Sequence, residues 1–364
     1  MTPEDARAQF PVLQRYAYLN AGSVGPLSRK THEALLAAEQ AELEEGRSGW
    51  PYLNRMIDAR AQLRAALAAQ VGVPTENMAL TSSTTESCRI VLSGLGLGPD
   101  DEIVTTDAEH FGLLGPLHVS GAAVRVAQVR DRPAGEALQS ILAEVGPRTR
   151  LIALSHVLWI NGHVLPMEAL RKETTVPLLV DGAQSVGALP VDAAPFDFYT
   201  VSGQKWLCGP APTGGLYVRD PDRLEVTQPS YFSQAKYERD GRFEPREGAA
   251  RFDPGWIPVA FLEALIAALE QLPDWRFERS RAMAESCRDR LVEIGCDIVT
   301  EPGHSNLVSW RWEGDTQEVA EKLGVGGVLI RDMPGTGLLR ASLGYWTNED
   351  DITRLVAGLR GLAR

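Results

Sequence analysis

Short apolar segments alternate with amphipathic helical patterns between about residue 79 and residue 218. Predicted helices in this region include 86–95 and 135–144, and the predicted strands are 78–80, 102–105, 124–129, 151–154, 178–180, 198–201 and 215–218. Alternation of this kind is typical of a mostly parallel sheet with helices on both faces. Because ligands of such sheets bind beyond the carboxyl ends of the strands, we expect functional residues at that edge.

The C-terminal part of the chain follows a different pattern. Helical stretches at 259–271 and 275–294 come before short strands at 305–312 and 327–330, and Thr347-Asn348-Glu349-Asp350 has the form of a capped start to a last helix, 351–362. We predict an α/β protein of two domains, because 364 residues exceed the usual size of one core. A large domain is expected at 16–257, and a smaller α+β domain at 258–364, completed by 1–15.

Composition and charge exclude several classes of function. The chain is 44% hydrophobic, and its net charge of −12, with no basic cluster, argues against nucleic-acid binding. No apolar run approaches the roughly 20 residues that cross a bilayer, and residues 1–5 lack the pattern of a signal peptide. The four cysteines have no Cys-x-x-Cys spacing, so neither disulfides nor a metal site is expected. We therefore expect a cytoplasmic enzyme with no membrane or nucleic-acid partner.

A lysine and an aspartate follow two neighbouring predicted strands. Lys205 lies in Ser202-Gly203-Gln204-Lys205-Trp206-Leu207-Cys208-Gly209-Pro210, after the apolar segment 196–201, and Asp181 follows the strand at 177–180. Pyridoxal phosphate (PLP) needs such a pair at adjacent strand ends. The lysine forms a Schiff base with PLP, and the aspartate keeps the pyridine nitrogen protonated so that the ring accepts electrons. The pair therefore predicts a PLP site.

The phosphate and the ring of PLP need further contacts. Hydroxyl groups and backbone amides at a helix N-terminus favour a phosphate, and Thr81-Ser82-Ser83-Thr84-Thr85-Glu86 provides them between a predicted strand and a predicted helix. The same segment also fits an ordinary capping box, which is the commoner meaning of such a segment taken alone. His110, after the next strand, is placed to stack on the ring, although a lone histidine there is more often only a loop residue.

Taken together, the motifs resemble those of the class V aminotransferases. This fold-type-I PLP group includes cysteine desulfurases, isopenicillin N epimerase-like proteins and ergothioneine-pathway C–S lyases. The matching blocks occur in the family's order over most of the chain. They are Tyr18-Leu19-Asn20-Ala21-Gly22, Ser83-Thr84-Thr85-Glu86, Glu109-His110, Val180-Asp181-Gly182-Ala183-Gln184, Ser202-Gly203-Gln204-Lys205 with Gly209-Pro210, and Leu339-Arg340-Ala341-Ser342-Leu343-Gly344-Tyr345. The resemblance implies a fold-type-I PLP transferase that forms a homodimer.

The resemblance also implies roles for single residues. Lys205 would bind the cofactor and then shuttle the Cα proton, Asp181 would pair with the pyridinium nitrogen, and His110 would stack on the ring. Gln184 would bind the ring hydroxyl. The phosphate would be held by Ser83, Thr84, Thr85, Ser202 and Gln204. Arg340 would bind the substrate carboxylate as a bidentate fork, with Asn20 in the same substrate site and Arg331 as a weaker candidate for the anion; the alternative for Arg340 is a surface arginine paired with an acid.

Several positions depart from the family's pattern. Desulfurases carry a nucleophilic cysteine between the positions of Arg331 and Arg340, and this chain has none there. His156 stands where many relatives have an asparagine beside the ring. Trp256 replaces the usual threonine in the loop that reaches the partner subunit's phosphate, and its indole N–H is still a donor. Cys208, close to Lys205, is expected to be a packed thiol.

The reaction is predicted less sharply than the cofactor. The missing cysteine and the segment Ser155-His156-Val157-Leu158-Trp159 favour a C–S (β-elimination) lyase or an aminotransferase. The alternatives are a cysteine desulfurase, an amino-acid epimerase, or a protein that binds PLP without catalysis. Gly94-Leu95-Gly96-Leu97-Gly98 suggests a nucleotide-binding enzyme instead, but those glycines precede a strand rather than open a helix. The expected substrate is a free amino acid, as a small molecule, and the sequence does not indicate its side chain.

Overall fold

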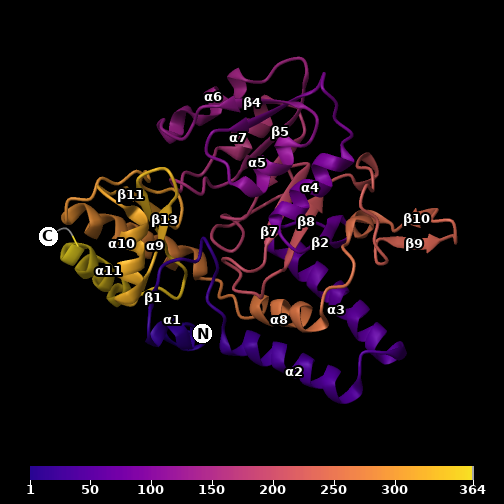
Figure 1. Ribbon diagram of the computed structural model, residues 1–364, viewed down its shortest axis with the longest axis horizontal. Helices are drawn as coiled ribbons and strands as arrows, with labels where there is room; N and C mark the ends of the chain where they lie inside the picture. Colours follow the sequence, from indigo (N-terminus) through magenta and orange to yellow (C-terminus); the bar gives the residue numbers. More distant parts are fainter. Residues whose placement is uncertain (363–364) are drawn as a thin grey trace.

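The computed structural model describes residues 1–362 and contains one large sheet of seven strands. Only β8 runs against its neighbours; the other strands are parallel to one another. In spatial order the strands are β2 (Met78–Thr81), β8 (Gly214–Val218), β7 (Phe198–Ser202), β6 (Leu178–Asp181), β5 (Thr149–Ser155), β3 (Glu102–Thr106) and β4 (Ala123–Ala127). The predicted α/β fold with a mostly parallel sheet is confirmed (Figure 1).

Helices cover both faces of this sheet. Side chains alternate along each strand, so Leu178 and Val180 of β6 pack in one core, whereas Leu179 packs in another. The second core is closed by α4 (Thr84–Gly94) and α5 (Phe111–His118). The first core is closed by α3 (Gly49–Gln70), α6 (Ala137–Ala143), α7 (Met167–Glu173) and α8 (Val259–Leu269). Asp181 continues the alternation and therefore belongs to the side of the sheet that α4 and α5 cover.

The C-terminal elements form a separate layered unit at one side of the large sheet (Figure 1). Its three-stranded antiparallel sheet has the order β11-β14-β13 and shares a core with the helices. The elements are α9 (Arg276–Glu293), β11 (Leu307–Arg311), α10 (Thr316–Val325), β12 (Val328–Leu329), β13 (Arg331–Met333), β14 (Leu338–Ser342) and α11 (Glu349–Leu362).

The N-terminal segment joins this C-terminal unit. β1 (Ala17–Tyr18) pairs in parallel with β12, and Arg7 in the last turn of α1 (Pro3–Ala8) binds Asp351 of α11, with 2.6 Å between Nη1 and Oδ2. α8 instead packs against α2 (Arg29–Glu45) and α3. The domain boundary between 257 and 258 stays a prediction.

Some elements were not predicted. The helices α2 and α3 were both missed. α2 has no clear apolar stripe, since it buries only Thr31 and Ala38. α3 does bury apolar residues at helical spacing, a pattern that was overlooked in the sequence; they are Met56, Ala59, Leu63 and Leu67. The hairpin of β9 (Gln234–Tyr237) and β10 (Phe243–Pro245) projects from the body on the side away from the C-terminal unit (Figure 1). Across residues 1–362, every helix is too short or too polar to span a bilayer.

Candidate active site

Asp181 is the last residue of β6, at the carboxyl edge of the large sheet. Its side chain is 4% exposed. Oδ1 accepts hydrogen bonds from the Ala183 backbone N–H (2.8 Å) and from the hydroxyl of Thr200 on the adjacent strand β7 (3.2 Å). Within the part of the chain that the structure describes, Oδ2 has no hydrogen-bond partner. Oδ1 is therefore held in place, while Oδ2 is free to accept a hydrogen bond from a ligand.

Lys205 lies in a tight turn directly after β7. The Cys208 backbone N–H donates to the Lys205 carbonyl at 3.1 Å, and the Gly209 N–H donates to the Gly203 carbonyl at 2.9 Å. The ammonium makes no hydrogen bond or ion pair with residues 1–362. Burial lowers the pKa of Lys205 to about 8; Asp181 opposes this shift, while Arg340 and Arg331 add to it. These charges shift the pKa of the amine because the turn places it close to all three side chains.

The N-terminal segment 20–25 lies over the lysine turn. The Gly25 N–H donates to the Gln204 carbonyl at 2.8 Å, and a Cβ at Gly25 would overlap the Lys205 carbonyl oxygen. Gln184 is held from two sides, since its Nε2 donates to the Gly22 carbonyl (2.8 Å) and its Oε1 accepts from the Trp206 indole (3.0 Å). The N-terminal segment thereby forms one wall of the site.

The N-terminus of α4 carries the predicted phosphate segment. The Ser83 hydroxyl accepts from the Glu86 N–H at 3.2 Å, so Ser83 does cap the helix as the alternative interpretation held. The hydroxyls of Thr84 and Thr85 have no partner among the described residues. α4 packs against β6 and β7, the strands that carry Asp181 and precede Lys205. A capped helix whose next two hydroxyls are unpaired can bind an anion.

His110 is the N-cap of α5 and is exposed. Its Nδ1 accepts from the Gly112 N–H at 3.0 Å, which leaves Nε2 as the protonated nitrogen of the neutral ring. The imidazole meets the Trp159 ring edge to face, with centroids 5.0 Å apart. The ring is desolvated where it packs against neighbouring side chains, which lowers the pKa of His110, and the positive charge of Lys205 adds to the shift. His110 therefore lies within electrostatic range of Lys205.

Two arginines face each other from β13 and β14. Arg331 and Arg340 are register partners across the two strands. Arg340 is 0% exposed; its Nη1 donates to the Trp159 carbonyl at 2.6 Å, while Nε and Nη2 are buried with no partner in residues 1–362. Arg331 donates to the Ser23 hydroxyl at 3.1 Å, and this hydroxyl donates to Asn20 Oδ1 at 2.8 Å. The alternative interpretation of Arg340, a surface arginine paired with an acid, does not hold, because the side chain is buried and has no acidic partner among the described residues.

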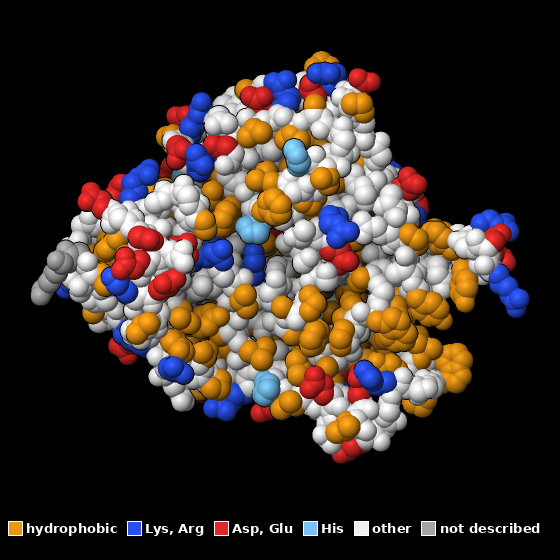
Figure 2. Space-filling model, viewed as in Figure 1, with side chains coloured by type: hydrophobic (Ala, Val, Ile, Leu, Met, Phe, Trp, Pro, Cys, Tyr) orange, Lys and Arg blue, Asp and Glu red, His pale blue; other side chains and the backbone are white. Residues whose placement is uncertain are grey.

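Burial and the charge of Arg331 both lower the pKa of Arg340. On the face seen in Figure 2, basic side chains and a histidine gather near the middle, between the C-terminal unit and the large sheet. A buried guanidinium with two free nitrogens and no counterion favours an anionic ligand such as a carboxylate.

The remaining predicted residues lie in three different surroundings. Ser202 and Gln204 are beside Lys205, and the Ser202 hydroxyl donates to Gln204 Oε1 at 3.1 Å. His156 follows Ser155 of β5 and faces the other side of the sheet: its Nδ1 lies 2.7 Å from the Tyr199 hydroxyl, and burial lowers its pKa to about 4. Trp256 is 62% exposed and packs edge to face on Phe232. Among residues 1–362, neither His156 nor Trp256 makes a hydrogen bond or ring contact with Lys205.

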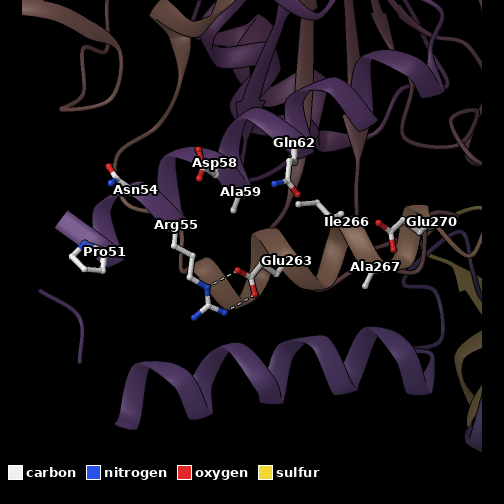
Figure 3. A pocket seen from close by; sticks show the side chains of 10 residues that line it. All are labelled: Pro51, Asn54, Arg55, Asp58, Ala59, Gln62, Glu263, Ile266, Ala267 and Glu270. Carbon is white, nitrogen blue, oxygen red and sulfur yellow. Dashed lines mark hydrogen bonds and ion pairs between the residues drawn. The ribbon is translucent and has the colours of Figure 1, made fainter. Parts of the chain in front are cut away.

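Trp159 belongs to the site although sequence reasoning gave it no role. It contacts His110 through its ring and Arg340 through its carbonyl. The four cysteines are free, and burial raises the pKa of Cys208 far above the usual range of a thiol. A separate cavity of about 540 Å³ lies between α3 and α8, where Arg55 binds Glu263 (Figure 3). It contains none of the residues around Lys205.

The free groups of the site match PLP and its amino-acid substrates. Lys205 offers an unpaired amine of lowered pKa, Asp181 offers an unbound carboxylate oxygen, and Thr84 and Thr85 offer hydroxyls at a helix N-terminus. The two free nitrogens of Arg340 add a place for a carboxylate. No metal-binding group of His, Cys, Asp and Glu occurs in the described residues.

Comparison with known proteins agrees with this chemistry. Residues 45–355 match the family model for aminotransferase class V. The chain is 28% identical to isopenicillin N epimerase of Streptomyces clavuligerus, over 99% of this chain and 98% of that protein. It is 30% identical to a probable cysteine desulfurase of Mycolicibacterium paratuberculosis, over 76% of this chain and 43% of that protein.

Solved structures are similar over nearly the whole chain. The cystine C–S lyase C-DES with its product cysteine persulfide has a TM-score of 0.90 and 29% identity, covering 96% of this chain and 99% of that one. A mutant of C-DES with glycine linked covalently to its PLP cofactor has a TM-score of 0.91, with 97% and 98% coverage. The family and the cofactor predicted from the sequence are confirmed: this chain belongs to the aminotransferase class V family and is a PLP-dependent enzyme.

Proposed function

We propose that the enzyme is a C–S lyase, which eliminates a sulfur group from the Cβ of an amino acid. The observation that carries the proposal is the presence in one site of a free amine at Lys205 and a buried guanidinium fork at Arg340 whose Nε and Nη2 have no partner among the described residues. The fork fixes an α-carboxylate, and the amine then stands close to the Cα–H of the same molecule. The likeness to the cystine C–S lyase C-DES supports elimination as the reaction branch.

PLP, when bound, draws electrons from the Cα of an attached amino acid. We assign Asp181 to the pyridine nitrogen, because its free Oδ2 is a fixed acceptor beside the sheet edge. His110 would cover the ring from the α5 side, and Gln184 would lie beside the ring hydroxyl. The phosphate would lie at the N-terminus of α4, among Ser83, Thr84, Thr85, Ser202 and Gln204.

Lys205 is the group we assign to proton transfer at Cα. Its pKa, lowered to about 8, makes a neutral amine available near neutral pH, as a base for this step requires. Arg331 and Asn20 would close the carboxylate side of the site through Ser23. Trp159 would separate His110 from Arg340 and keep water out of this corner.

The cysteines argue against the usual desulfurase route. That route needs an accessible thiolate in the segment between Arg331 and Arg340, and none is present there. Cys208 is buried, with its pKa raised by burial, and donates to the Trp206 carbonyl at 3.8 Å. Transamination and epimerisation remain the alternatives, since both begin with removal of the same Cα proton.

We also propose that the enzyme is a cytoplasmic homodimer. Large apolar side chains are exposed over α2, α3 and the neighbouring loops (Figure 2). They include Leu36, Leu43, Trp50, Ile57, Tyr231 and Trp256. Patches of this kind usually mark an interface, and a second copy would cover them and receive Trp256 near its phosphate site. The thiols are free, as the reducing cytoplasm keeps them.

Product analysis tests the reaction branch. Purified enzyme would be incubated with a panel of amino acids and S-substituted cysteines, including cystine. Elimination is expected to give pyruvate, ammonia and a thiol or persulfide. A keto acid that retains the side chain, together with the pyridoxamine form of the cofactor, would identify an aminotransferase. Conversion to the D-amino acid without loss of sulfur would identify an epimerase.

A further inference from the structure

Glu109 is a buried carboxylate that the roles above do not use. It is 4% exposed and follows β3, directly before the N-cap His110 of α5. Its Oε1 accepts from the Thr106 hydroxyl at 2.6 Å, and its Oε2 accepts from the Ser155 backbone N–H at 3.0 Å and the Ser155 hydroxyl at 2.5 Å. The three bonds tie the carboxyl end of β3 to the carboxyl end of β5.

Both strand ends that Glu109 links are connected to residues of the active site. Ser155 is the register partner of Asp181 across β5 and β6, and the next backbone N–H, of His156, donates to the Asp181 carbonyl at 3.0 Å. On the other side, His110 is joined to Glu109 by one peptide bond. Glu109 therefore lies behind the strand ends from which Asp181 and His110 project.

We propose that Glu109 is a positioning residue for Asp181 and His110. Its hydrogen bonds fix the two strand ends, and its negative charge makes the potential at Asp181 more negative. A more negative potential at Asp181 would keep the pyridine nitrogen of bound PLP protonated to higher pH, because opposite charges attract more strongly in a site that water does not screen.

The charge of Glu109 is expected to depend on pH. Burial raises its pKa to about 7, the bonds from Ser155 and Thr106 oppose this shift, and the Asp181 carboxylate adds to it. The Cys88 thiol of α4 also faces Glu109; burial raises the pKa of this thiol, and both carboxylates add to that shift. Glu109 is therefore ionised above pH 7 and neutral well below it. Its effect on the cofactor should follow the same course.

The test compares Glu109→Gln with Glu102→Gln. Glutamine at 109 has nearly the same shape and can accept the bonds from Ser155, but it carries no charge. Glu102 is an apt control because it is also buried, at 5% exposure, but lies at the other end of β3, paired with Arg148. Each variant would be loaded with PLP labelled with ¹⁵N in its ring, and the ring nitrogen shift and the visible absorption band would be followed from pH 5.5 to pH 10.

In Glu109→Gln the ring nitrogen is expected to lose its proton at a pH lower by about half a unit or more, a threefold change in proton affinity. Below about pH 6 the spectra of variant and wild type should converge, and Glu102→Gln should titrate like the wild type. Ser155→Ala removes one donor and should shift the titration in the same direction by less. This second variant decides the question if Glu109→Gln does not fold.

Wild-type titration curves in Glu109→Gln and Ser155→Ala, or an equal shift in Glu102→Gln, would overturn the proposal and leave Glu109 a packing role. Neither readout depends on which amino acid the enzyme converts.

Discussion

Replacing Arg340 with methionine should separate fold stability from substrate binding. The guanidinium is 0% exposed and has one partner, the Trp159 carbonyl at 2.6 Å, while Nε and Nη2 are unpaired within residues 1–362. Each unsatisfied buried donor costs about 1–3 kcal/mol, and the lost bond contributes only about 1 kcal/mol. Methionine fills similar space without polar atoms. Without substrate, Arg340→Met should thus be at least as stable as the wild type, with a gain of about 1 kcal/mol or more.

The same change should weaken binding of amino acids. Losing one side of a buried, hydrogen-bonded charge pair costs about 2–5 kcal/mol, which corresponds to a Kd about 30-fold to 5000-fold higher. Spectral titration of the PLP-loaded enzyme gives this Kd for an S-substituted cysteine and for its decarboxylated amine. The amine has no carboxylate and should bind both proteins equally.

Arg311→Met on the adjacent strand β11 is the matched control, because that side chain is 58% exposed and should affect neither measurement. Equal loss of affinity for the amino acid and the amine, or an Arg340→Met variant clearly less stable than the wild type, would refute the assignment of Arg340 to the carboxylate.

Three further predictions concern pH and shape. Since burial lowers the pKa of Lys205 to about 8, PLP uptake by the apo-enzyme should accelerate as pH rises through 8; acceleration only above pH 10 would contradict this. Folded Glu109 has a pKa of about 7 against 4.5 for the free group, so its ionisation lowers the stability of the fold progressively as pH rises between those values. Relative to Glu109→Gln, the free energy of unfolding of the apo wild type in urea should fall by about 3 kcal/mol between pH 4 and pH 8. A difference in stability between the two proteins that does not change with pH would argue against the raised pKa. A Cβ at Gly22 would lie 2.8 Å from Arg340 Nη2, so Gly22→Ala should weaken amino-acid binding about tenfold or more, whereas Gly255→Ala, where the added atom meets open space, should bind as the wild type does.

The strand pattern predicted where Asp181 and Lys205 lie because each depends on local sequence. An apolar run of four or five residues followed by small or polar residues marks a buried parallel strand and its end. Since β6 and β7 are adjacent and parallel, the two strand ends meet without any long-range information beyond the order of the strands. The motif blocks then identified the family.

Side-chain direction was harder to predict. Ser155 and His156 are consecutive, so they point to opposite faces of the sheet: Ser155 binds Glu109, and His156 binds Tyr199. A shift of one residue in the strand would exchange which of the two faces the cofactor side of the sheet. A residue in a loop, such as Trp159, belongs to no repeating pattern from which the direction of its side chain can be predicted. The pairing of Arg331 with Arg340 depends on the register of a short hairpin, which the pattern of this glycine-rich segment does not specify.

The most direct test of the account is to locate the cofactor's covalent attachment. The holoenzyme would be reduced with borohydride, digested, and mapped by mass spectrometry. The chain has five lysines, and the other four, Lys30, Lys172, Lys236 and Lys322, are exposed and away from the strand ends. The account predicts a pyridoxyl group on Lys205 alone, and none on a folded Lys205→Ala variant. A label on another lysine, or an unchanged label in that variant, would contradict it.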